Sequence, residues 1–243
     1  MAAAGREALE CMRVLAKTGA SIVSEALRGA DGFYEWEHYP AGDVYDPQSH
    51  AQFYYHAHPP AERGGEHGHF HTFLRPRGMP AGMRPLMLPE LAIPDAPAQP
   101  QGPVLPPAPQ PNQGEGNEKL SHLVAISMSP RGLPLRLFAT NRWVTGETWY
   151  RAEDVARMLE RFVVDLARPS RPLNRWVSAM FVLFRPEMAA LLAARDAAIM
   201  QWRRRHRGKI HVLEDRRLEV ASAVDIDVEE QVRRVEAVLK RVA

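Results

Sequence analysis

Apolar residues recur along the chain with two different spacings, which separate predicted helices from predicted strands. A recurrence every three or four positions predicts one apolar helix face in five segments: residues 6–28, 152–167, 173–184, 186–206 and 228–242. The first helix is expected to break near Gly19 and to stop at Gly29. Between Phe33 and Leu74, aromatic residues at short spacing alternate with turn residues, which predicts strands.

Two further hairpins are predicted in the second half of the chain. HLVAISM and LPLRLFATN, residues 122–128 and 133–141, are strand-like runs joined by SPRG. WVTGETWY follows as a further strand or turn, and residues 210–226 alternate around EDRR as a final hairpin. Runs of strands followed by runs of helices indicate an α+β protein, with an antiparallel sheet and helices packed on one side.

A proline-rich segment divides the chain into three parts. Twelve prolines fall between Pro76 and Pro111, and much of this stretch lacks large apolar side chains, which predicts a long disordered or polyproline-like insertion. Its earlier part, MRPLMLPELAI, is apolar enough to pack back on the domain. We expect residues 1–75 to supply a helix and histidine-rich strands, 76–117 the loop or linker, and 118–243 the remaining hairpins and helices of the same domain.

Composition narrows the class of protein. A 45% hydrophobic fraction over 243 residues supports a large core, and the net charge of +2 is too balanced to indicate a nucleic-acid or membrane-surface partner. Cys11 is the single cysteine, so a metal site within one chain must use nitrogen and oxygen ligands. The N-terminal residues do not read as a signal peptide, and no stretch approaches the roughly 20 apolar residues of a membrane span. We therefore expect a cytoplasmic protein without a membrane partner.

Five of the ten histidines fall in the stretch AQFYYHAHPPAERGGEHGHFHTFL, residues 51–74. Residues two apart in a strand share a face, and PPAERGGE has the composition of a hairpin loop. Pairing His58 with His67 sets His56 against His69 and Tyr54 against His71. This register predicts one face that carries all five imidazoles and a second, mostly apolar face with Phe53, Tyr55, Phe70 and Thr72.

A crowded imidazole face favours a divalent transition metal, zinc or iron, because neighbouring imidazoles oppose one another's protonation. Three histidines along one strand span about 13 Å, so one ion should take two ligands from one strand and the rest from the other. The first choices are His56 and His58 with His69 or His67, and His71 completes the candidate set. A carboxylate ligand would indicate iron, and the candidates are Glu62, Glu66, Glu37 and Glu147. His122 and Asn141 are further contributors if their strands pair beside the hairpin.

Two resemblances follow from these residues. His56, His58 and Glu62 resemble the first metal motif of the cupin family, in which two histidines two apart precede a glutamate. The sequence departs from that motif: no glycine lies six positions before His56, His69 stands where the next glycine belongs, and no second cupin motif follows. GHFHTF, together with LFATNRWVTGETW, resembles an uncharacterised bacterial family of unknown function, and this resemblance implies no activity.

Three functional classes remain open from the sequence. The first is a metal-binding protein, with the histidine face acting on a small molecule as substrate. The second is a non-enzymatic binding or assembly module, in which the histidines form a structural surface and the proline-rich segment engages a protein partner. The third is a nucleic-acid accessory protein that uses the basic run from Arg203 to Lys209, although cations at a helix C-terminus are also an ordinary solvated feature.

Overall fold

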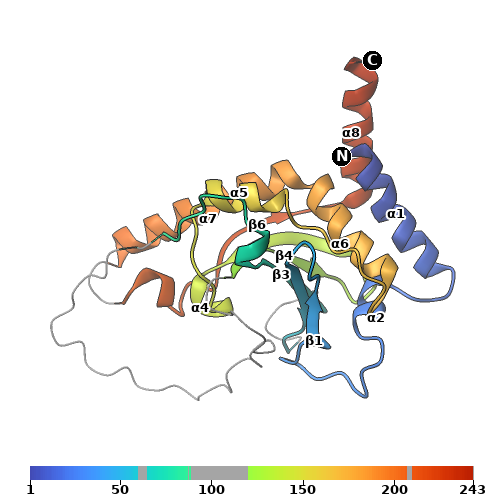
Figure 1. Cartoon of the computed structure of the whole chain (residues 1–243), viewed down its shortest axis with the longest axis horizontal. Helices are drawn as coiled ribbons and strands as arrows, with labels where there is room; N and C mark the ends of the chain where they lie inside the picture. The colour runs from blue at the N-terminus through green and yellow to red at the C-terminus, as the bar shows by residue number, and fades with distance from the viewer. Residues whose placement is uncertain (60–64, 87, 89–119, 207–209, 243) are drawn as a thin grey trace.

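The computed structural model describes residues 1–59, 65–86, 88, 120–206 and 210–242. Its strands form a single antiparallel sheet in the order β1-β2-β3-β4-β5-β6, so each strand pairs with the next in the chain (Figure 1). The strands are β1 (Tyr39–Tyr45), β2 (Ala51–His56), β3 (Gly68–Leu74), β4 (Ser121–Met128), β5 (Pro134–Thr140) and β6 (Val220–Asp225).

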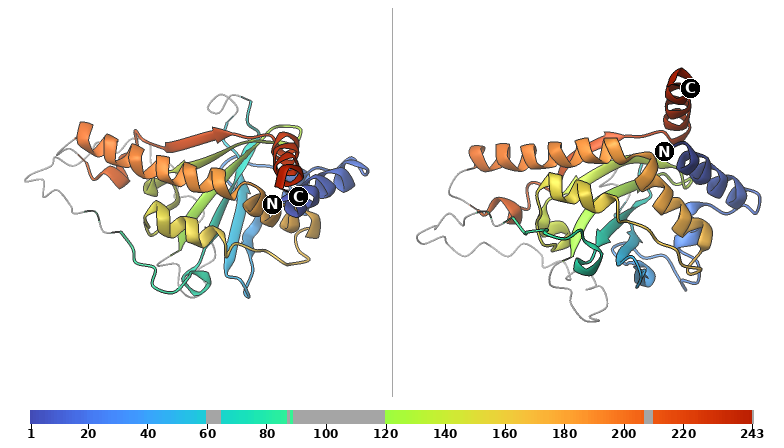
Figure 2. Two further views of the ribbon diagram at one scale, coloured as in Figure 1. Left: turned by 90° about the horizontal axis from the view of Figure 1, so that it is seen from above. Right: turned by 45° about the horizontal axis from the view of Figure 1, so that its top comes forward.

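Helices cover one face of this sheet, as the sequence predicts. The α-helices are α1 (Ala2–Ala16), α2 (Ile22–Ala26), α4 (Arg142–Thr145), α5 (Ala152–Leu159), α6 (Arg171–Leu183), α7 (Arg185–Arg205) and α8 (Val228–Val242), and short 3₁₀ turns span Pro76–Gly78 (η1) and Val212–Glu214 (η3). In both views of Figure 2, α5, α6 and α7 lie along the same side of the strands. The expected α+β architecture is therefore confirmed.

The main core lies between the sheet and the helices. Phe53, Tyr55 and Phe70 on the central strands are fully buried, and the Phe70 ring lies 5.9 Å from that of Trp176 on α6. These residues occupy the face that the sequence predicts to be apolar. His56, His69 and His71 are consequently on the other face of the sheet.

The register of the histidine hairpin is confirmed over the length of β2. His56 pairs with His69, Tyr54 with His71 and Tyr55 with Phe70. β3 continues into the sheet by pairing with β4, where His71 stands opposite Ala125. The sheet thus unites strands from both sides of the proline-rich segment, and His122 on β4 comes within reach of the histidine hairpin.

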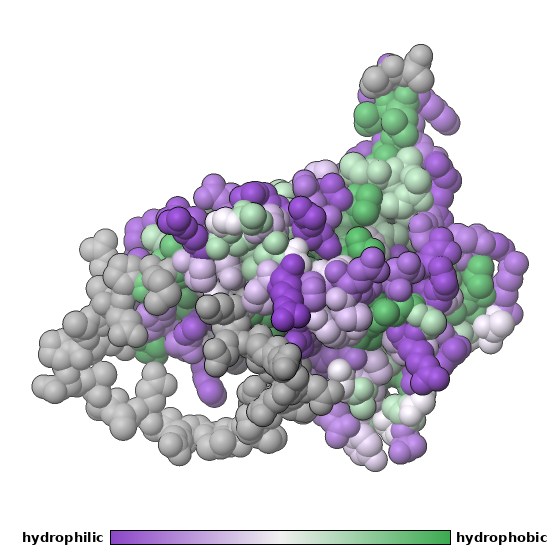
Figure 3. Space-filling view, viewed as in Figure 1, coloured by the Kyte–Doolittle hydropathy of each residue, from purple (hydrophilic) through white to green (hydrophobic). Residues whose placement is uncertain are grey.

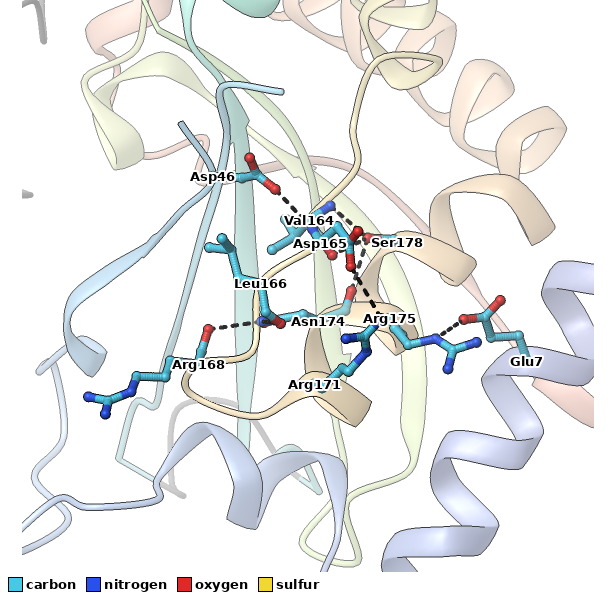
Figure 4. Close-up of polar contacts among 10 residues, drawn as sticks. All are labelled: Glu7, Asp46, Val164, Asp165, Leu166, Arg168, Arg171, Asn174, Arg175 and Ser178. Carbon is cyan, nitrogen blue, oxygen red and sulfur yellow. Dashed lines mark hydrogen bonds and ion pairs between the residues drawn. The ribbon is translucent and has the colours of Figure 1, made fainter. Parts of the chain in front are cut away.

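The predicted helix 152–167 is wrong in its second half, because the chain leaves the helix after Leu159. Asp46, in the turn between β1 and β2, accepts a hydrogen bond from the Asp165 backbone N–H at 2.9 Å. Ser178 Oγ lies 2.9 Å from Val164 N, and Asn174 Nδ2 donates to the carbonyls of Leu166 and Arg168 (Figure 4). These bonds hold an extended segment against α6 and the turn between β1 and β2.

The predicted hairpin over residues 210–226 is also wrong. Only β6 is a strand, and it pairs with β5, for example Ala223 with Phe138. The residues before it form η3, whose Val212 and Leu213 are both buried in a small apolar cluster with Trp149. Asp215 fixes this turn, because its carboxylate accepts hydrogen bonds from Trp202 Nε1 and from the Arg217 guanidinium.

Most of the proline-rich segment lies outside the described residues, and so does Glu62. Of the apolar stretch at its start, Met83 packs against the main core and Leu86 and Leu88 against the Trp149 cluster. The Leu86 backbone N–H also donates to the Trp149 carbonyl at 2.8 Å. This described part of the stretch packs on the domain as expected.

The face seen in Figure 3 is mainly polar over its coloured residues, with an apolar patch on α8. This helix projects from the body, and its residues Val238 and Leu239 are more than half exposed (Figures 1 and 3). No helix in the described part of the chain is both long and apolar enough to cross a membrane alone. α6 and α7 meet the length and composition criteria only as a pair, and the chain bends by 72° between them.

Candidate metal centre

Cross-strand pairing places the candidate ligands in two adjacent rows of the sheet. One row runs through His56, His69 and Ser127, and the next runs through Tyr54 and His71 to Ala125. Directly opposed residues in antiparallel strands lie about 5 Å apart, and residues two apart on a strand share a face. The side chains of His56, His69 and His71 therefore meet on the face that the helices do not cover.

The ring nitrogens of these histidines converge. His69 Nε2 lies 2.7 Å from His56 Nε2 and 3.1 Å from His71 Nε2. His58, just beyond β2, joins the group, so that one nitrogen each from His56, His58 and His69 lies within 4.8 Å of the other two. Two nitrogen ligands on one tetrahedral zinc, each about 2.0–2.1 Å from the ion, are about 3.3 Å apart. The observed Nε2–Nε2 distances of 2.7 and 3.1 Å are close to the separation of two nitrogen ligands on one zinc ion.

The Glu66 carboxylate contacts the His69 ring on the side that faces away from the other histidines. Glu66 Oε1 lies 2.7 Å from His69 Nδ1, and Glu66 Oε2 accepts a hydrogen bond from Ser127 Oγ at 2.5 Å. Because a carboxylate can only accept, His69 Nδ1 carries the proton and the His69 Nε2 lone pair faces the cluster. Metal-ligating histidines commonly donate their outer N–H to a carboxylate in this way, and the carboxylate fixes both tautomer and ring orientation.

The cluster extends inward to a buried carboxyl group. His71 Nδ1 lies 3.0 Å from His122 Nε2, and the His122 backbone N–H donates to Glu147 Oε2 at 2.6 Å. Burial lowers the pKa of His71 well below its usual value and that of His122 to about 3, while it raises the pKa of Glu147 to about 8. The inner part of the cluster is therefore held in its uncharged form at neutral pH, and neutral imidazole is the form that binds metals.

Aromatic side chains enclose the cluster. The Phe138 ring lies 5.0 Å from that of His69, and the Tyr54 ring lies 5.3 Å from that of His71. His58 is only half-buried and contacts Trp36, with ring centroids 4.1 Å apart. The group thus has an inner wall of buried rings and an outer edge at His58 that is nearer to solvent.

His67 does not lie with the other four histidines of the hairpin, contrary to the predicted register. β3 begins at Gly68, so strand alternation does not extend to His67. A Cβ at Gly68 would be 2.5 Å from Tyr55 Oη, so this glycine leaves room for the tyrosine hydroxyl, which lies 2.6 Å from His67 Nδ1. His67 is consequently held by a residue of the apolar face.

The structure brings only some of the other carboxylate and polar candidates to the cluster. Glu66 contacts the cluster directly, Glu147 contacts it through His122, and Glu37 is exposed. Asn141 lies elsewhere: it caps α4 and donates to the Val212 carbonyl at 2.8 Å.

Sequence reasoning missed His38 and Ser127 as neighbours of the site. His38 stacks flat on Tyr54, with ring centroids 3.5 Å apart and an interplanar angle of 10°. Neither residue belongs to the runs of histidines two residues apart from which the hairpin site was predicted. Ser127 could have been found from the alternation of β4, once that strand was paired with β3.

Comparisons with known proteins assign the chain to a family but do not assign it an activity. A family model described as "Domain of unknown function (DUF6969)" matches residues 2–226, which include every described residue of the cluster. No curated protein and no solved structure matches the chain.

Proposed function

Because the chain belongs to DUF6969, whose description assigns no function, its activity must be argued from the site, and we propose that it binds a divalent transition metal through His56, His58 and His69. The observation that carries the proposal is the convergence of three imidazole nitrogens within 4.8 Å of one another. The register between β2 and β3 pairs His56 with His69, and His58, two residues beyond His56, joins them from just past the end of β2.

The contacts of His69 favour a metal over a purely hydrogen-bonded cluster. With the His69 Nδ1 proton directed to Glu66, the His69 Nε2 has one lone pair, yet it faces the Nε2 atoms of both His56 and His71. In the absence of an ion, both neighbours would have to donate to this single lone pair. A shared cation removes that requirement, because each nitrogen then directs its own lone pair to the metal.

The ligand chemistry favours zinc over iron. An iron site of the facial type needs a carboxylate beside two histidines. Here the nearest described carboxylate, Glu66, bonds the outer nitrogen of His69 and the Ser127 hydroxyl. A set of three imidazoles with an outer carboxylate is typical of catalytic zinc.

Three protein ligands would leave a coordination position for water or a small molecule, which supports an enzyme that acts on a small-molecule substrate. A zinc ion bound here would act as a Lewis acid and lower the pKa of its bound water. His58, at the half-buried edge, lies where such a molecule would enter, and the aromatic rings of Tyr54 and Phe138 would exclude water from the inner side.

A closed structural site is the second candidate, and His71 favours it. Its Nε2 lies 3.1 Å from that of His69, which makes it a candidate fourth nitrogen. Structural zinc sites are closed by four protein ligands, whereas catalytic sites keep one position open. The non-enzymatic class expected from the sequence would take this form.

Metal analysis of protein purified without a histidine tag tests the proposal. We expect one zinc ion per chain in the wild type and none after His56→Ala with His58→Ala. The control is the double variant His206→Ala with His211→Ala, since neither histidine contacts the cluster. Absence of stoichiometric metal from the wild type, or full loading of the His56 and His58 variant, would contradict the proposal.

A further inference from the structure

His38 is a buried imidazole beside the cluster that the proposed ligand set does not use. It lies just before β1, its side chain is 7% exposed, and its ring stacks on Tyr54. The His38 ring centroid lies 6.0 Å from that of His56. His38 therefore borders the proposed metal centre from a segment outside the histidine hairpin.

A chain of buried polar contacts fixes the orientation of His38. Its Nδ1 lies 3.1 Å from Asp43 Oδ1, and Asp43 Oδ2 accepts a hydrogen bond from Gln52 Nε2 at 2.7 Å. Gln52 Oε1 in turn accepts from Arg75 Nε at 2.8 Å. The Asp43 side chain is 3% exposed, so this carboxylate is committed to His38 and Gln52.

The backbone conformation of β1 places the Asp43 carboxylate beside His38. The register between β1 and β2 shifts between Tyr39 and Val44, and Asp43 in this interval has a φ of 60°. A non-glycine residue in the left-handed region is uncommon and costs energy, and such residues persist where the surrounding structure demands them. This irregular stretch of β1 places the Asp43 carboxylate next to His38 Nδ1, as the Glu66 carboxylate lies next to His69 Nδ1.

The second nitrogen of His38 has no hydrogen-bond partner among the described residues. His38 Nε2 is buried, and no described group of the chain donates to it or accepts from it. Since the Asp43 carboxylate holds the proton on Nδ1, Nε2 presents a bare lone pair at the opposite edge of the ring. Leaving a buried acceptor unsatisfied costs about 1–3 kcal/mol, so a group of this kind in a native protein is usually met by an ordered water or by a bound molecule.

We propose that His38 Nε2 accepts a hydrogen bond from an N–H or O–H group of a molecule bound at the metal centre, and that Asp43 positions it for this contact. The inference rests on the proposed function, because the molecule would be held by the metal. It assigns the site a ligand class: small molecules that offer one lone pair to the metal and one hydrogen-bond donor to His38. His38 is outside the group of nitrogens within 4.8 Å, so it acts on the bound molecule and not as a ligand.

Imidazole and 1-methylimidazole form a matched pair of probes for this contact. Both bind metals through one ring nitrogen, and only imidazole carries an N–H on its other side. Loading the protein with cobalt(II) gives a visible spectrum with which both dissociation constants can be measured. One neutral hydrogen bond predicts a preference of roughly 3- to 10-fold for imidazole in the wild type.

Three variants complete the experiment. His38→Phe keeps the ring that stacks on Tyr54 and removes the acceptor, so the preference should fall to near unity while metal affinity stays unchanged. Asp43→Asn should lower the preference in the same way, because an amide no longer enforces a bare Nε2. His206→Phe is the control: the His206 ring packs against Trp202, with ring centroids 4.2 Å apart, away from the cluster, and the imidazole preference of this variant should equal the wild-type value.

The outcomes separate the two proposals. Metal bound at full stoichiometry with the same imidazole preference in wild type and His38→Phe overturns the role of His38 alone. Failure of the wild type to bind either cobalt or zinc overturns both the metal centre and this inference. A preference lost in His38→Phe and Asp43→Asn and kept in His206→Phe establishes the contact.

Discussion

The two faces of the histidine hairpin are built from alternate residues of the same two strands, yet they are stabilised differently. The face toward the helices buries Phe53, Tyr55 and Phe70, where each aromatic side chain gains the free energy of leaving water. The opposite face buries His56, His69 and His71 almost as completely. Burying polar rings gives no comparable gain and requires a partner for each nitrogen. The difference suggests that the first face maintains the fold and the second serves a function.

Substitution of His69 should separate the two faces most strongly. His69→Ala removes the nitrogen that faces both His56 and His71, so we expect metal affinity to fall by more than the roughly 100-fold that an outer-sphere change can cause. His67→Ala, in the same hairpin but bonded to Tyr55, should leave metal affinity unchanged. Competition with a chromophoric chelator measures both, and equal losses in the two variants would contradict the division into faces.

Substitution of the next residue should have the opposite consequence. Phe70→Ala truncates a fully buried ring that contacts Trp176, and we expect a loss of about 3–5 kcal/mol in the free energy of unfolding. The folded fraction should still bind one metal per chain. Urea denaturation with metal analysis of the native protein tests this. A metal-free but fully stable Phe70→Ala protein would show that the faces are not independent.

The buried carboxyl of Glu147 makes the free energy of unfolding depend on pH. Its pKa is raised from 4.5 to about 8, so between these values the folded state holds a proton that the unfolded state has released. Stability from this group therefore falls as pH rises through that window, by about 1.4 kcal/mol per pH unit. Glu147→Gln removes the effect.

The Glu147→Gln variant should gain about 2 kcal/mol relative to wild type between pH 5.5 and pH 7.5. The measurement is urea unfolding of both proteins in the presence of a metal chelator. Burial also lowers the pKa values of His71 and His122, so both proteins should lose stability as pH falls below 6.5, and this shared loss cancels in the comparison. A difference that does not vary with pH would show that Glu147 is ionised in the folded protein.

Among the changes in metal affinity, the smaller effect is expected at Glu66. Glu66→Gln keeps the contact with Ser127 but weakens the hold on His69 Nδ1, and we expect metal affinity to fall about 10- to 100-fold. Glu37→Gln, at an exposed position, is the matched control and should bind like the wild type. A Glu66 variant with wild-type affinity would show that the carboxylate does not orient the ligand.

The sequence predicts the histidine hairpin well because two-residue alternation and register determine each other. A slip of one residue would mix imidazoles with Phe70 and Tyr55, so the pattern itself selects the pairing that the structure has. The alternation is wrong for His67, which it places on the imidazole face, because Gly68 admits the Tyr55 hydroxyl and the strand begins there.

Other parts of the fold depend on contacts that no local pattern encodes. Phe162, Val164 and Leu166 have a spacing that suits either a helix or an extended chain. The bonds from Asp46 and Ser178 are what hold that segment extended. His38 and Asp43 are likewise joined to the site by a register shift in β1 and a buried glutamine, which become visible only in three dimensions.

X-ray absorption spectroscopy of the zinc-loaded, tag-free protein tests the central claim most directly. The account predicts zinc with three imidazole nitrogens at about 2.0–2.1 Å, and a loss of imidazole scattering in His56→Ala. Coordination by oxygen alone, or the same histidine coordination in wild type and His56→Ala, would contradict it.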